Sequence, residues 1–227
     1  MTNLQAGLLD YMDPVLSNTD LYWAGFQRSF GFIVWVTIAS LILGTLVAAC
    51  RVSPVAPLRA FGTFYVTVVR NCPLTVVLFF FAFGLPELGI NLEFYWFGVW
   101  GLSIYTAAFV CEAIRAGVNS VSPGQAEAAR AIGLKFGQSL SQVILPQAFR
   151  STIPPLGSVM IAMFKNSAVA GAFGIGGDLF SVFRSLSSAQ GFPPLPVLIG
   201  VALGFLVITI PAGIALSVIE RKVAIAR

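Results

Sequence analysis

The chain has 227 residues, of which 57% are hydrophobic and 10% are charged, and its formal net charge is +4. Soluble domains carry about a quarter charged residues, and a body of 24.2 kDa cannot hide so many apolar side chains from water. These values exclude a soluble protein and argue against a nucleic-acid partner, so the lipid bilayer is expected to solvate one membrane domain over residues 1–227.

Five membrane-spanning helices are predicted, because the apolar residues form continuous blocks without the alternation typical of a β-barrel. In chain order the spans of this all-α protein cover residues 28–50, 64–85, 94–111, 154–173 and 195–219. Arg70 and Pro73 fall inside the second span, and Lys165 falls inside the fourth. Pro73 interrupts the helical hydrogen bonds, so free backbone groups are expected beside it.

The Lys and Arg residues between the spans predict the orientation, because short cytoplasmic loops are enriched in them. With the N-terminus outside, only Arg28 and Arg184 lie on the outer side. The cytoplasmic side then collects Arg51, Arg59, Arg115, Arg130, Lys135, Arg150, Arg221, Lys222 and Arg227. A multi-pass protein with its N-terminus outside and its C-terminus in the cytoplasm is therefore predicted.

Residues 112–151 are too polar to span the membrane and form a predicted cytoplasmic loop. Ser122 and Gln125 fit a capping box, with Pro123 at the first helical position. Strong helix formers follow, and Gly133 offers a C-terminal stop. The pattern predicts a helix of about ten residues that is slim because it is rich in alanine.

A second short helix is expected over residues 136–145, with Pro146 ending it. Helices of this length are marginal on their own. The alanine-rich helix must therefore pack on its own domain or enter a groove on a partner protein. The alternative is that it rests at the lipid headgroups.

Short motifs along the chain carry a family resemblance. They are Arg70-Asn71-Cys72-Pro73-Leu74, Tyr105 to Arg115, Gly124 to Ala129, Leu145-Pro146-Gln147-Ala148 and Lys165-Asn166-Ser167. Glu127-Ala128-Ala129, with Gly133 and Ile144-Leu145-Pro146 after it, looks like the EAA loop of ABC importer permeases. From about residue 31 to residue 220, the chain resembles the polar amino acid permease family, and within it glutamate-type permeases. It departs from the family at Asn71-Cys72, where Gly-Thr is common, and at Ser167-Ala168-Val169, where Thr-Ser-Leu is common.

The resemblance implies a type I ABC importer permease in the cytoplasmic membrane of a bacterium. Such a permease pairs with a second permease chain, here a related chain in preference to a second copy. A dimer of ATP-binding subunits sits beneath the pair, and an extracytoplasmic amino-acid-binding protein delivers the substrate. The EAA loop is the coupling element that docks on the ATPase. Its expected coupling residues are Gly124, Gln125, Glu127, Ala128, Ala129, Arg130 and Gly133.

Two cations inside the predicted spans point to the cargo, since each is costly in the bilayer. Arg70 and Lys165, with Asn166 and Ser167, are the candidate substrate-binding residues, because cations in a wet pathway suit the carboxylates of glutamate. Alternatively, Arg70 extends to the headgroups, and Lys165 pairs with Glu112 or with a backbone carbonyl.

The sequence offers no catalytic or metal-binding set. It contains no His, no phosphate-binding loop and no ligand-like spacing of Cys. The chain is therefore not expected to be an enzyme or to hold a cofactor, and ATP belongs to a partner subunit. The alternative function is a self-sufficient channel or secondary transporter, although the spans offer few acidic residues for a proton relay.

Overall fold

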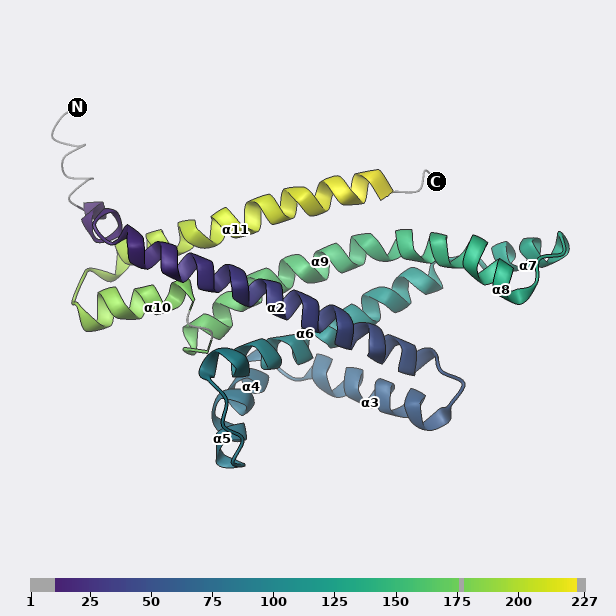
Figure 1. Ribbon diagram of the computed structural model, residues 1–227, viewed down its shortest axis with the longest axis horizontal. Coiled ribbons are helices and arrows are strands. Elements are labelled where there is room, and N and C mark those ends of the chain that lie inside the picture. Colours follow the sequence, from purple (N-terminus) through teal and green to yellow (C-terminus); the bar gives the residue numbers. More distant parts are fainter. Residues whose placement is uncertain (1–10, 176–177, 224–227) are drawn as a thin grey trace. The chain divides into compact units, whose positions relative to one another are not determined.

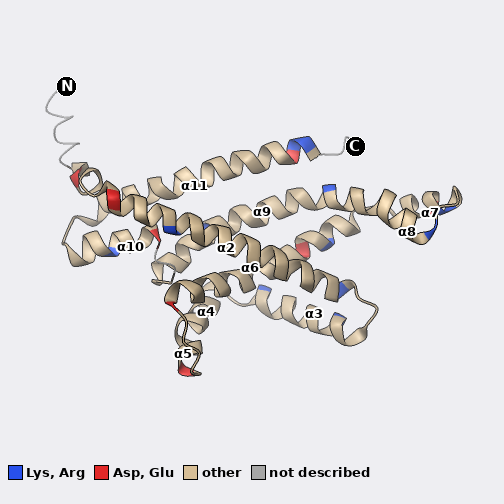
Figure 2. Ribbon diagram, in the orientation of Figure 1, with Lys and Arg blue, Asp and Glu red and all other residues tan. Residues whose placement is uncertain are grey.

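The computed structural model describes residues 11–175 and 178–223, and every regular element in that part of the chain is a helix (Figure 1). The prediction of an all-α protein is confirmed. Charged side chains are sparse along the helices (Figure 2), as expected for a chain that lies in lipid. Arg227, which the sequence assigns to the cytoplasmic side, lies outside the described residues.

The helices have these bounds: α2 (Thr19–Val52), α3 (Ala56–Asn71), α4 (Leu74–Phe79), η1 (Phe80–Gly84), α5 (Leu85–Glu87), α6 (Phe94–Asn119), α7 (Pro123–Ala131), α8 (Phe136–Gln138), η2 (Ser139–Ile144), α9 (Leu145–Ala172), α10 (Leu179–Phe183), η3 (Arg184–Ala189) and α11 (Pro194–Val223). The segments η1, η2 and η3 are π-helical, and each follows an α-helix directly. Residues 11–16 are also helical.

Among the described residues, three helices are each long and apolar enough to cross a membrane, namely α2, α6 and α11. A fourth candidate is the bent pair of α3 with α4 and α5. The predicted span over residues 64–85 is therefore not one straight helix. It breaks at Cys72 and Pro73, where Cys72 has the extended conformation that a following proline favours.

The helix α9 covers the predicted fourth span as far as Ala172 but begins nine residues earlier than expected, at Leu145 instead of Pro154. Pro146 does not end a helix, so that expectation is wrong. It lies in the first turn of α9, where proline is tolerated, and α8, η2 and α9 follow one another without a gap. Although α9 has 28 residues, Lys165 and its prolines make it less apolar, and its crossing of the membrane stays a prediction.

The helices form two compact units. The first unit comprises Met1–Thr37, Leu74–Leu102 and Met163–Ala212, and the second comprises Ile38–Pro73, Ser103–Ala162 and Gly213–Arg227. The long helices α2, α6, α9 and α11 each contribute residues to both units.

The first unit is held together by buried polar contacts as well as by apolar packing. The Ser29 hydroxyl accepts a hydrogen bond from the Leu179 backbone N–H (3.0 Å), and the Tyr22 hydroxyl donates to the Val197 carbonyl (3.1 Å). Asp178 caps α10 by accepting from the Phe180 N–H (3.0 Å). Burial raises the pKa of the Asp178 carboxyl to about 6, because the charged form loses hydration.

The second unit has a core that joins α2, α3 and α6. Its buried members are Val47, Ala48, Val66, Ala108 and Cys111. The Tyr65 hydroxyl donates to the Ile104 carbonyl (2.5 Å) and fixes α3 on α6. Gly44 lets α2 approach Val110 so closely that a Cβ there would clash. This core positions the charged cluster that lies beside it.

Candidate functional site

The helix α7 is the structural counterpart of the predicted coupling helix, and it begins at Pro123 as expected. The capping box is not formed, because the Ser122 side chain makes no capping hydrogen bond. The Gln125 side chain instead accepts a hydrogen bond from the Gln147 amide (3.4 Å), which ties α7 to the start of α9. The start of this helix therefore depends on proline and on a tertiary contact.

The end of α7 follows the expected glycine stop. Gly133 has φ of +87°, a left-handed conformation that favours glycine. The Gly133 N–H donates to the Arg130 carbonyl (2.9 Å), and the Leu134 N–H donates to the Ala129 carbonyl (3.1 Å). These bonds close the last turn and send the chain toward α8. Gly133 therefore has a conformational role in the coupling segment.

The surface of α7 divides into an inner and an outer side. The inner side packs on η2, where Ala129 is buried (3% exposed). The predicted contact residues Glu127, Ala128 and Arg130 are exposed. Two large apolar side chains are also exposed, Ile132 (78%) directly after the helix and Phe136 (79%) at the start of α8. The segment therefore presents charged and apolar groups together on its free side.

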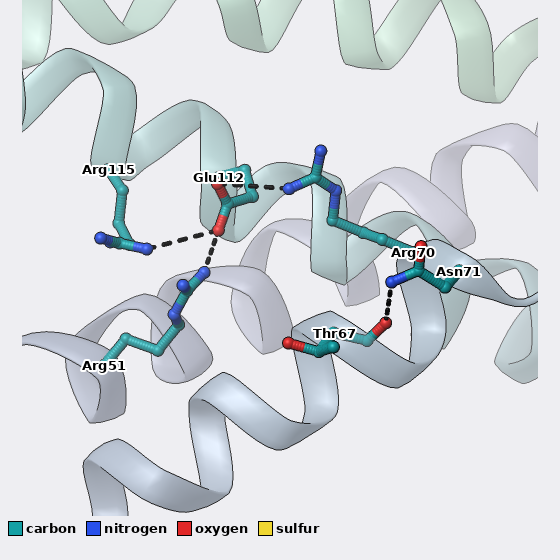
Figure 3. Close-up of polar contacts among 6 residues, drawn as sticks. All are labelled: Arg51, Thr67, Arg70, Asn71, Glu112 and Arg115. Carbon is teal, nitrogen blue, oxygen red and sulfur yellow. Dashed lines mark hydrogen bonds and ion pairs between the residues drawn. The ribbon is translucent and has the colours of Figure 1, made fainter.

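A second candidate site is a cluster of three arginines around one carboxylate in the second unit (Figure 3). Glu112 of α6 pairs with Arg51, with Arg70 (3.4 Å) and with Arg115 (3.4 Å). The pair with Arg115 is local, since the two residues lie three positions apart on α6. Because one negative charge faces three positive charges, the cluster keeps a net positive charge.

Arg70 is the most exposed of the three arginines, with 46% of its side chain accessible, whereas Arg51 has 14%. The Arg70 guanidinium also lies 5.8 Å from the centre of the Phe109 ring, which attracts a cation. Asn71, beside it, uses its amide to donate to the Thr67 carbonyl (2.7 Å) at the end of α3. Arg70 therefore has the most accessible guanidinium of the cluster.

The other candidate substrate-binding residues lie in the first unit, on α9. Lys165 is exposed and makes no hydrogen bond or ion pair with the other described residues. Asn166 is half-buried. Ser167 is buried (2% exposed), and its hydroxyl donates to the Phe164 carbonyl (2.7 Å) within the helix. Arg70 and Lys165 thus belong to different units.

Sequence reasoning missed the role of Arg51. It placed Arg51 on the cytoplasmic side from the distribution of Lys and Arg and gave its side chain no partner. In the structure this side chain packs against Gly62 of α3, and its guanidinium pairs with Glu112. Gly62 was the available signal in the sequence, because a glycine leaves room for a neighbouring side chain. It does not identify the partner of Arg51.

Comparison with known proteins identifies the family. Residues 40–225 match the family described as "Binding-protein-dependent transport system inner membrane component". This chain belongs to that family. The permease is 40% identical over 208 residues to "Probable glutamine ABC transporter permease protein GlnM" of Bacillus subtilis (strain 168), with 92% of this chain and 95% of the relative covered.

A second relative and a solved structure agree with this assignment. The permease is 38% identical over 223 residues to "Glutamate transport system permease protein GluC" of Corynebacterium efficiens, with 89% of this chain and 97% of the relative covered. A chain in the crystal structure of an amino acid ABC transporter with histidines superimposes with a TM-score of 0.85 at 30% identity, covering 92% of the permease and 96% of that chain. The resemblance to ABC importer permeases is confirmed.

Family membership defines the general role of the permease. It is a multi-pass membrane subunit of a binding-protein-dependent importer, and its family works with an ATPase and a substrate-binding protein. Subunits of this family form the transport pathway and are not enzymes themselves, and the family has no cofactor of its own.

Proposed function

We propose that the permease forms part of the translocation pathway of an ATP-driven importer for a polar amino acid of the glutamate type. Two relatives support this substrate class, since their names assign them to glutamine and to glutamate. The exposed guanidinium of Arg70 has the charge that carboxylates require, and so does the ammonium of Lys165, which pairs with no other described residue. Asn166 and Ser167 supply polar groups beside Lys165.

The proposal includes the assembly of the importer and its orientation. The permease pairs with a second, related permease chain, and two ATP-binding subunits dock on the cytoplasmic side, where they alone bind ATP. An amino-acid-binding protein delivers substrate to the outer side. The N-terminus lies outside and the C-terminus lies in the cytoplasm, an arrangement that the distribution of Lys and Arg supports.

The free side of α7 is the observation that carries the docking proposal. Ile132 and Phe136 expose more than three quarters of their surface, in a loop that also carries Arg130 and Lys135. Exposed apolar groups of this size next to charges are typical of protein-binding surfaces. The alternative is that α7 rests at the lipid headgroups. Substitutions in α7 distinguish these two interpretations.

Variants of α7 test the docking. We expect Glu127→Ala together with Gly133→Val to lose the ATPase from the purified complex. Valine at a left-handed position strains the end of α7 by about 1–2 kcal/mol, and alanine removes a charged contact. The measurement is mass spectrometry of the proteins that co-purify with the tagged permease in mild detergent. Glu87→Ala, at an exposed position of α5, is the control.

The outcome separates three interpretations. Retention of the ATPase by the double variant would contradict the coupling role of α7. The channel alternative would be supported if the wild-type permease also purified without an ATPase. The purified chain would then have to move solute in liposomes without ATP. Recovery of a second permease chain from the wild type would distinguish a heteromer from a pair of identical chains.

Lys165 is the sharpest test of the substrate class. Lys165→Ala removes an exposed cation that forms no ion pair within the described part of the chain, so the fold should be unaffected while substrate loses a charge-assisted hydrogen bond. We expect uptake of labelled glutamate and glutamine to fall roughly 10- to 100-fold, with the complex still assembled. Lys222→Ala, in the last turn of α11, is the control. Unchanged uptake and affinity would remove Lys165 from the proposed site.

A further inference from the structure

A polar pocket in the first unit shares no lining residue with either candidate site. It has a volume of about 590 Å³, within the range of small-molecule sites. Its walls come from α2, from the start of α6 and from Gly174. The polar lining residues are Gln27, Arg28, Glu93, Tyr95 and Trp96.

Two opposite charges line this pocket without neutralising each other. Arg28 lies on α2 and Glu93 directly precedes α6, and both side chains are exposed. Within the part of the chain that the structure describes, no ion pair joins them to each other or to any other group. The Glu93 backbone carbonyl accepts from the Trp96 N–H (2.8 Å) and so belongs to the first turn of α6. A ligand with both charges could satisfy the two side chains together.

The aromatic wall of the pocket is held rigidly. The Tyr95 ring meets Phe32 edge-on with centroids 5.7 Å apart, and the Trp96 ring meets Trp35 with centroids 5.8 Å apart. Tyr and Trp gather where a membrane protein meets the water interface. Their polar ends offer a hydroxyl and an indole N–H to a ligand at that depth.

Gly31 keeps part of the pocket open. A Cβ at Gly31 would lie 3.6 Å from the Tyr95 hydroxyl oxygen, which is an ordinary contact distance. Alanine therefore fits there without moving the backbone, whereas leucine would extend into the space beside the hydroxyl. This position allows the pocket to be filled while both charges are kept.

We propose that this pocket binds a zwitterion, with an oxyanion on Arg28 and a primary ammonium on Glu93. Two sources carry this chemistry, namely the headgroup of phosphatidylethanolamine and a free amino acid. If the ligand is a lipid, the proposal does not depend on which substrate the permease transports. A free amino acid as ligand rests on the proposed function, and the pocket would then be an outer site that substrate occupies before it enters the pathway.

Lipid retention tests the first source. The complete complex is placed in nanodiscs of phosphatidylcholine that contain either phosphatidylethanolamine or phosphatidylglycerol, and native mass spectrometry counts the lipids that remain bound. Phosphatidylglycerol lacks the ammonium. We expect the wild type to retain phosphatidylethanolamine selectively. Arg28→Gln, Glu93→Gln and Gly31→Leu should each reduce retention at least about tenfold.

Binding of tritiated glutamate and glutamine to the same samples tests the second source. Saturable binding that the three variants weaken at least about tenfold, and that Lys165→Ala leaves in place, assigns the pocket to a free amino acid. Arg59→Gln and Glu87→Gln, both exposed and outside the pocket, are the charge-matched controls. Gly31→Ala should behave as the wild type does.

Two results would overturn the proposal. In the first, neither lipid nor amino acid distinguishes the wild type from the Arg28→Gln/Glu93→Gln double variant. In the second, phosphatidylglycerol is retained as well as phosphatidylethanolamine and Glu93→Gln has no effect, so that the pocket binds an anion alone. Failure of amino acid uptake in the wild type would contradict the proposed function, while selective retention of phosphatidylethanolamine would still support the pocket.

Discussion

Replacing Glu112 by glutamine is expected to abolish transport and to lower the thermal stability of the permease. Glu112 is the shared partner of Arg51, Arg70 and Arg115, so the variant leaves three guanidinium groups facing one another. Breaking a buried ion pair costs 3–5 kcal/mol, but these side chains are partly exposed, so we expect about 2–3 kcal/mol. The measurement is the melting temperature of the purified complex, alongside uptake in proteoliposomes.

A compensating variant makes this prediction specific. Arg51→Gln in the Glu112→Gln background removes the least exposed of the three cations, and it should recover part of the lost stability. Gln at both positions can still form a neutral hydrogen bond. An unchanged melting temperature in Glu112→Gln would show that the cluster does not stabilise the second unit.

Gly117→Leu is expected to have an equally large effect, by forcing α6 away from α9. A Cβ at Gly117 would lie 2.7 Å from the Cα atom of Thr152. The Thr152 Oγ1 atom lies even nearer, but the Cα atom and the Cβ atom (2.8 Å) stay in place when the threonine is shortened to alanine. Shortening the threonine side chain therefore cannot relieve the clash. Overpacking typically lowers the free energy of unfolding by about 1–3 kcal/mol. For a clash with backbone we expect a loss of about 3 kcal/mol or more. Fluorescence-detected size exclusion should show loss of the folded permease.

The matched control for this variant is Gly213→Leu in α11. Gly213 is also helical, but beyond its chain neighbours and the adjoining backbone of α11 no atom of the described residues lies within 4 Å of the position that a Cβ would take. It should therefore fold as the wild type does. If Thr152→Ala restored the folded yield of Gly117→Leu, the clash would lie with the side chain and the close approach of the two backbones would be refuted.

The sequence predicted best where local chemistry decides the outcome. Phe94 begins α6 and Pro123 begins α7 as expected, because an apolar block and a proline at the first helical position act through neighbouring residues. Gly133 likewise ends α7 in the left-handed conformation expected of it. The family also followed from ordered motifs, since each motif carries its meaning in a few adjacent residues.

The errors arose where distant contacts decide. Pro146 was expected to end a helix, yet the π-helical η2 leads into α9 and the proline falls in its first turn. The Gln125 side chain bonds to Gln147, 22 residues away, in place of the predicted cap. The three-arginine cluster depends on Arg51 reaching α6 from 61 residues away. Hydropathy and spacing contain no information about such pairings.

The π-helical segment η2 makes the helical repeat itself a determinant of docking. Between α8 and α9 the N–H of Leu145 reaches back to the carbonyl of Leu140, so one turn holds more residues than an α-helical turn does. If the same residues adopted the α-helical repeat, everything before this segment would rotate by about 100° around the axis of α9 for each residue that the wide turn absorbs. Since α7 packs on η2, its free side would then point in a different direction. A substitution that removes the π-helical turn is thus expected to separate the permease from its ATPase while leaving every contact residue of α7 unchanged.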